Sequence, residues 1–107
     1  MFNLEINDLD KKIWDEELND FVPEKVYDVH THIYQWQSNL DKNKNTGPYK
    51  YQGENFQNVS FDLLNKVDNK LMPERVVERL SFPFPYNYPC DFNNSNHYVS
   101  SQTNNHQ

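Results

Sequence analysis

Apolar positions in the first part of the chain follow a helical spacing. Between residues 8 and 21 they recur at steps of three to five residues, which predicts a helix with one apolar stripe. Asp8 or Asp10 is expected to cap the start of this helix, and Pro23 is expected to end it. The stripe consists of Leu9, Ile13, Leu18 and Phe21, with Trp14 alongside.

Two further segments have helical patterns. Residues 60–72 are expected to form a second helix with Ser60 as its N-cap, and residues 92–102 a more polar third helix capped by Asp91. The apolar face of the second helix holds Phe61, Leu64, Val67 and Leu71.

Alternating apolar and polar residues predict two strands, at residues 25–34 and 76–84. A long polar loop is expected at roughly residues 37–58, and a proline-rich loop follows the second strand. Strict alternation along the first strand separates two sets of side chains. One face would carry Val26, Asp28, His30 and His32, and the other Tyr27, Val29, Thr31 and Ile33.

The order of these elements predicts an α/β fold with parallel strands, because each strand is preceded by a helix. A short repeat supports this order. Residues 21–26 and 71–76 match position by position in residue type, 50 residues apart, and each closes a helix and opens a strand. A chance similarity between two connectors of a common kind stays open as the alternative.

Composition and charge narrow the class of protein. A chain of 107 residues allows at most one domain, and an apolar share of 36% with a mean hydropathy of -1.04 is lean for a self-sufficient globule. The net charge of -6 arises entirely within residues 1–28, which hold nine acidic and three basic side chains. A nucleic-acid-binding protein needs a basic face, and the sequence has none, so we expect no nucleic-acid partner.

The single cysteine, Cys90, excludes an internal disulfide. The N-terminus lacks a basic region followed by an apolar one, and no apolar run reaches about 18 residues. We therefore expect a cytoplasmic protein that does not enter a membrane.

The strongest chemical signal is the run Asp28-Val29-His30-Thr31-His32 in the first strand. Residues two apart on a strand lie about 6.6 Å apart on one face, so two imidazoles there can converge on one metal ion. Asp28 is then placed to accept a hydrogen bond behind the ligands or to form the floor of the site. The alternative is a strand that merely carries polar residues on one face.

Two histidines do not complete a zinc site, which requires three or four protein ligands. The remaining candidates by residue type are His97, His106 and Cys90, and none of them stands in a position that predicts a third ligand. The motif therefore predicts half of a metal site.

The segment FVPEKVYDVHTHIY resembles the opening of the amidohydrolase superfamily, and most of all its amidohydrolase-related branch. In that branch an acidic helix with a tryptophan leads through a Pro-Glu turn into a first barrel strand that ends in Asp-x-His-x-His. Trp14, Pro23 and residues 28–32 match these features, and LSFPFPYNYPCDFNNSNHYV is similar to the second strand and the loop and helix after it. The resemblance covers nearly the whole chain and is most specific over residues 14–34.

The resemblance implies a (β/α)₈ TIM-type barrel with its site at the carboxyl ends of the strands. A barrel needs about 250 residues, so residues 1–107 would be the incomplete N-terminal part of one barrel domain, with a leading helix and about two βα units. His30 and His32 would be the first two ligands of a divalent metal, expected to be Zn²⁺. The other functional residues of the family have no counterpart, and no catalytic residue is identifiable in this chain.

The implied function is that of a metal-dependent hydrolase, which activates water for attack on the carbonyl of an amide, a lactone or a related small-molecule substrate. Relatives that decarboxylate aromatic acids or isomerise uronates use similar frames, so these reactions stay open. A different class of alternative is a non-catalytic fragment. It would either be inactive alone or fold only with a partner, such as a missing C-terminal barrel portion or further copies of the chain in a homo-oligomer. A third and weaker alternative is a small metal-buffering protein that uses His30 and His32, for which two ligands are few.

Aromatic residues follow both strands. Tyr34, Trp36, Tyr49 and Tyr51 lie in the loop after the histidines, where they would contact a substrate or pack the loop against its own domain. The Phe-Pro-Phe-Pro-Tyr run at residues 82–86 is similar, and would form a wall, a lid or a substrate surface.

Overall fold

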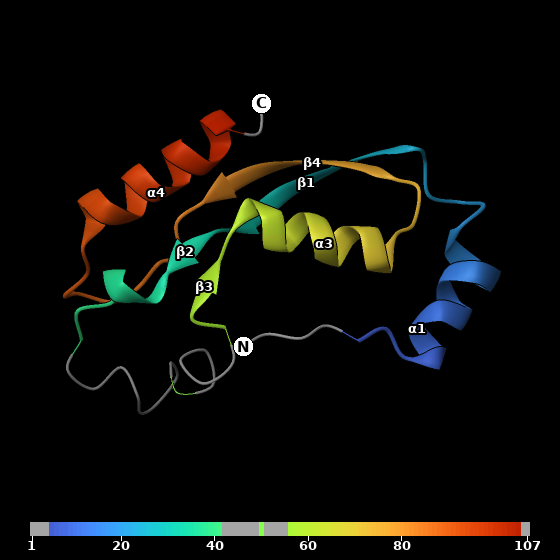
Figure 1. The fold of residues 1–107 in the computed structure, drawn as a ribbon, viewed down its shortest axis with the longest axis horizontal. Helices are drawn as coiled ribbons and strands as arrows, with labels where there is room; N and C mark the ends of the chain where they lie inside the picture. Colours follow the sequence, from blue (N-terminus) through green and yellow to red (C-terminus); the bar gives the residue numbers. More distant parts are fainter. Residues whose placement is uncertain (1–4, 42–49, 51–55, 106–107) are drawn as a thin grey trace.

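In the computed structural model, residues 5–41, 50 and 56–105 are described. They form a mixed α/β fold, as predicted (Figure 1). In chain order the elements are α1 (Asp8–Ile13), a π-helical segment (Trp14–Leu18), β1 (Lys25–His32), β2 (Tyr34–Gln35), a 3₁₀ turn (Trp36–Ser38), β3 (Asn58–Val59), α3 (Phe61–Leu71), β4 (Val76–Phe82) and α4 (Phe92–Asn105).

The two longest strands, β1 and β4, are parallel neighbours, which confirms the predicted strand direction. Lys25 lies beside Val76 and His32 beside Phe82, and β1 holds one extra residue between Asp28 and Thr31. The extra residue forms a β-bulge, so side chains before and after it point to different faces than in a regular strand. A short antiparallel pair, β2 with β3, leads from the end of β1 into α3.

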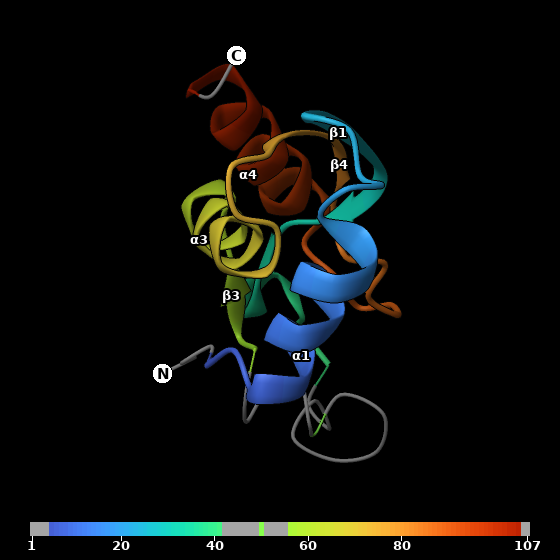
Figure 2. The same cartoon turned by 90° about the vertical axis from the view of Figure 1, so that its right-hand side faces the viewer.

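The helices α3 and α4 lie on one side of the β1–β4 sheet, and no helix among the described residues covers the other side (Figures 1 and 2). Side-chain exposure along β4 follows this arrangement. Val77, Arg79 and Ser81 are partly buried, whereas the residues between them are exposed. We call the two sides the helix-covered face and the open face of the sheet.

The helix caps follow the local sequence. Ser60 caps α3 by accepting a hydrogen bond from the Leu63 amide at 3.1 Å, and Asp91 accepts one from the Asn94 amide at 2.9 Å, so both predicted caps are confirmed. The prediction that Asp8 or Asp10 caps the first helix is wrong. Asn7 is the cap, because its side chain binds the Asp10 amide while the Asp10 carboxylate reaches back to the Asn7 amide.

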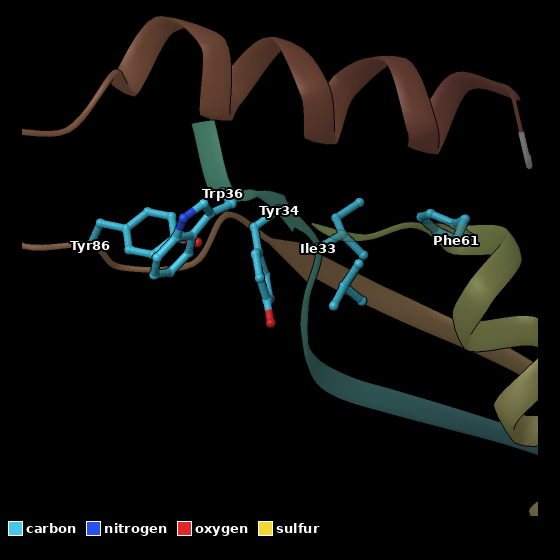
Figure 3. Packing of buried hydrophobic residues seen from close by; sticks show 6 residues of the cluster. Ile33, Tyr34, Trp36, Phe61 and Tyr86 are labelled. Carbon is cyan, nitrogen blue, oxygen red and sulfur yellow. The ribbon is translucent and has the colours of Figure 1, made fainter. Parts of the chain in front are cut away.

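The main core lies at the carboxyl end of the sheet, between the β2–β3 pair, α3 and the proline-rich segment (Figure 3). Ile33, the residue after β1, is completely buried at its centre. The other buried members of the cluster are Tyr34, Trp36, Val59, Phe61 and Tyr86.

The apolar stripe of the first helix has no such core to face. Only Trp14 is buried, beneath the Arg75 guanidinium, which lies 5.0 Å from the centre of the ring. Leu9 and Phe21 are 63% and 82% exposed. The helical turns also end at Leu18, before the predicted end at residue 21, and the chain reaches β1 through a turn.

Most of the predicted polar loop at residues 37–58 lies outside the described residues. Its described ends are ordered by pairing, since Asn39 forms a β-bridge with Cys90 and the Asp91 amide donates to the Ser38 carbonyl at 2.8 Å. Within the part of the chain that is described, no helix has the length and apolarity needed to cross a membrane.

Candidate metal centre

His30 and His32 stand at the carboxyl end of β1, and their imidazole rings meet. The two Nε2 atoms lie 3.1 Å apart, and the ring centres are 4.9 Å apart in an edge-to-face arrangement. His30 is exposed and His32 is partly buried. The structure therefore brings together the two residues that the sequence predicts as a metal-binding pair.

The orientation of His32 is fixed by the strand next to it. Its Nδ1 lies 3.1 Å from the carbonyl oxygen of Pro83, which follows β4. A carbonyl oxygen only accepts, so this contact requires Nδ1 to donate, and in that tautomer Nε2 is the nitrogen available to bind a metal. Histidines that bind metals are commonly held in this way, with the second ring nitrogen donating to a backbone carbonyl.

The β-bulge decides which side chains share a face. Asp28 lies beside Arg79 and His32 beside Phe82, and positions 79 and 82 of β4 are on opposite faces because they are three residues apart. The prediction that Asp28 and both histidines point the same way is therefore wrong. Asp28 belongs to the helix-covered face and the histidines to the open face.

Asp28 nevertheless contacts the site through the backbone. Its Oδ1 accepts a hydrogen bond from the backbone amide of His30 at 3.0 Å, within the bulge. The carboxylate also raises the pKa of Asp68 on α3, although burial of Asp68 is the larger cause of that rise. Asp28 thus fixes the main chain at His30 and makes no contact with an imidazole in the described structure.

The donor set fits part of a zinc site. Two nitrogen ligands at about 2.0–2.1 Å from one tetrahedral zinc ion lie about 3.3–3.4 Å from each other, close to the 3.1 Å between the two Nε2 atoms. Among the described residues, however, no group of three or more His, Cys, Asp or Glu side chains could hold an ion. His97 is exposed on α4, and His106 lies outside the described residues.

A cavity of about 690 Å³ opens beside the two imidazoles at the carboxyl end of the β1–β4 sheet. Its walls come from the ends of β1 and β4, from the proline-rich segment and from the first turn of α4. Cys90 lines it too, with Sγ 4.0 Å from the Ser95 Oγ. Of the residues in the 82–86 run, Phe82 to Pro85 line the cavity, as predicted for a wall, while Tyr86 is buried in the core.

The two aromatic residues predicted for the loop after the histidines take a different place. Tyr34 and Trp36 are each only 9% exposed and belong to the core, so the structure favours the packing alternative for both (Figure 3). Tyr49 and Tyr51 lie outside the described residues. A contact of Tyr34 or Trp36 with a substrate has no support in their positions.

Sequence reasoning missed the part of the cavity that α4 supplies. Phe92, Ser95 and Asn96 line it, although the sequence marks them only as the start of a polar helix. The connection from β4 to α4 is the available signal, because in parallel α/β folds the loop after a strand and the start of the next helix lie at the carboxyl end of the sheet. The Pro83 carbonyl that contacts His32 is a backbone group, so no residue type in the sequence indicates its role.

Comparison with known proteins adds no further identification. No protein-family model, no curated protein and no solved structure matches the chain. The resemblance to the amidohydrolase superfamily therefore depends on the motif residues alone.

Proposed function

We propose that this chain carries the first half of the metal centre of an amidohydrolase-type, metal-dependent hydrolase that acts on a small molecule. The observation that supports it best is the pairing of the His30 and His32 Nε2 atoms at 3.1 Å, with His32 oriented by the Pro83 carbonyl. Both histidines stand at the carboxyl end of a parallel strand, where barrel enzymes hold their catalytic residues.

The open face of the sheet supports a larger domain than the described residues form. Val29 and Leu80 are 71% and 58% exposed on this face, and Tyr27 is exposed as well. In a (β/α)₈ barrel the face opposite the helices is the packed interior. We infer that residues 1–107 are the N-terminal part of such a barrel, in which later strands cover this face and supply the missing ligands.

The proposal assigns separate tasks to the residues of this chain. His30 and His32 would hold a divalent metal, expected to be zinc, which when bound activates water and polarises a carbonyl group. The Pro83 carbonyl would keep His32 in an orientation that leaves Nε2 for the metal, and Asp28 would hold the His30 backbone. The cavity beside the pair would admit the substrate.

A non-catalytic role is the second candidate, and the same open face favours it. A two-stranded sheet with one apolar face bare is marginal on its own, so the chain would need a partner or further copies of itself to fold stably. Intact-mass spectrometry of the natural polypeptide separates the candidates. A mass well above 30 kDa, the scale of a whole barrel, supports the enzyme, whereas 12.9 kDa alone excludes catalysis by the isolated chain.

Zinc titration of the purified chain tests the metal site directly. We expect His30→Ala and His32→Ala each to weaken zinc binding at least about tenfold, because each removes one of two nitrogen ligands. His97→Ala is the matched control, since it removes an exposed histidine of α4, and it should leave the affinity unchanged. Equal effects of all three substitutions, or none, would show that the pair is not a metal site.

A further inference from the structure

The cavity beside the histidines is unusually poor in charge for a chain that is so polar. Among the described residues that line it there is no Lys, Arg, Asp or Glu. Its polar groups are the two imidazoles, with Cys90, Ser95 and Asn96 at the α4 side. The apolar wall consists of Val29, Phe82, Pro83, Phe84, Pro85 and Phe92.

Two phenyl rings flank the imidazoles at close range. The centre of the Phe82 ring lies 6.0 Å from that of His30, and the centre of the Phe84 ring lies 5.7 Å from that of His32, both edge-to-face. A ligand whose polar end reaches the two Nε2 atoms therefore has its body against aromatic rings. Aromatic groups gain binding free energy from such ring contacts beyond the burial of their area.

This lining disfavours polyhydroxylated substrates. Each hydroxyl of a sugar acid that enters an apolar wall loses its hydrogen bonds to water and must find a partner, or binding is weakened. The wall made by the phenylalanines and prolines offers few partners, and the described residues of the lining include no cationic side chain for a carboxylate. A cavity of 690 Å³ also lies in the usual range for a small organic ligand.

We propose that the cavity binds a small uncharged aromatic carbonyl compound, an aryl amide or ester, with its ring against Phe82, Phe84 and Phe92. The carbonyl end would point at His30 and His32, so the inference rests on the proposed function. It narrows the reactions left open by the sequence, because it favours an aryl amide or ester over a uronate.

Binding of 4-fluorobenzamide to the purified chain, followed by fluorine NMR, tests the inference. We expect binding that benzamide reverses and D-glucuronate at the same concentration does not. Phe82→Ser and Phe92→Ser should each weaken it about fivefold, through the lost ring contact. Phe21→Ser is the matched control, since Phe21 is also an exposed phenylalanine but lies outside the cavity lining, and it should change the affinity less than twofold.

Zinc affinity measured on the same samples separates this inference from the proposed function. Zinc binding that depends on His30 and His32, without any binding of 4-fluorobenzamide, overturns the aromatic ligand and leaves the metal site standing. Binding of the probe without such zinc binding supports the aromatic cavity and overturns the metal assignment. Displacement by D-glucuronate as effective as that by benzamide, or an equal loss in Phe21→Ser, overturns the inference.

Discussion

The two faces of the β1–β4 sheet differ in what covers them, although both carry apolar residues. On the helix-covered face, Thr31 is buried. Ile33, two residues further along the chain, is completely buried in the core. On the open face, Val29 and Leu80 are mostly exposed. Parallel sheets are normally covered on both faces, and their strands are apolar on both. The difference is consistent with the proposal that a second layer, outside the described residues, covers the open face.

The candidate site lies where the two faces exchange roles along β1. Before the bulge, Asp28 points to the helix-covered face, and after it His32 points to the open face. A regular strand would have kept the two residues on one side. The bulge therefore lets the strand contribute Ile33 to the core while both histidines face the cavity.

The largest difference between the two faces should appear when one apolar side chain on each is shortened to alanine. Ile33→Ala should lower the free energy of unfolding by about 2–5 kcal/mol, because it leaves a cavity in the core. Val29→Ala, on the open face of the same strand, should change it by no more than about 0.5 kcal/mol. Urea unfolding of the purified chain measures both values.

Similar losses for the two variants would contradict the comparison. That result would mean that Val29 is already buried in solution, for example by association of two chains through their open faces. Repeating the measurement at several protein concentrations would reveal such association, because the stability of an associated state depends on concentration.

Much of the fold could be predicted from the sequence, because local patterns determine it. The spacing of Phe61 and Leu64 with the Ser60 cap determines α3, and alternation determines β1 and β4. The order of elements, with a helix before each strand, predicted that β1 and β4 run parallel. The burial of Tyr34 and Trp36 could not be decided from their types, since aromatic rings serve equally in cores and in binding surfaces.

The candidate site was less predictable than the fold. The His-x-His spacing predicted that the two imidazoles converge, and their Nε2 atoms do lie close together. The predicted face of Asp28 was wrong because β1 contains a bulge after this residue. Whether a bulge forms depends on how the Asp28 carboxylate and the neighbouring strand satisfy the His30 amide, and residue types alone do not reveal this. The Pro83 carbonyl that orients His32 is a backbone atom 51 residues away along the chain.

Two ion pairs offer a smaller and more specific test of the same comparison. On the helix-covered face the Arg79 side chain is only 2% exposed, and it binds both Asp68 and Asn65 on α3. On the open face Lys25 and Glu78 pair at 2.9 Å in solvent. Asp68→Ala should cost about 2 kcal/mol, because it leaves a donor of the buried Arg79 guanidinium without its acceptor. Glu78→Ala should lower the stability of the chain far less, because both of its partners lie in solvent.

The pH dependence of the two pairs should have opposite signs. Burial raises the pKa of Asp68 above its ordinary 3.8, against the influence of Arg79, so the stability it contributes is complete below that value and declines as pH rises through the raised pKa. The hydrogen bond from Lys25 lowers the pKa of Glu78 below 4.5, so its contribution is present above that value and is lost as pH falls. Urea unfolding of the wild type and both variants across this acid range tests the signs. Parallel slopes for the two variants would contradict them.

The smallest expected effect concerns Asp28, at the boundary between the faces. Its Oδ1 holds the His30 amide at 3.0 Å, so Asp28→Ala should loosen the bulge and weaken zinc binding about twofold to fivefold, the effect of one hydrogen bond. Asp28→Asn keeps an oxygen acceptor at that position and should stay within about twofold of the wild type. If Asn weakens zinc binding as much as Ala does, the negative charge of Asp28 acts on the ion. If neither substitution changes it, the histidine pair keeps its geometry without the bulge contact, and the two faces are less strictly separated than the register indicates.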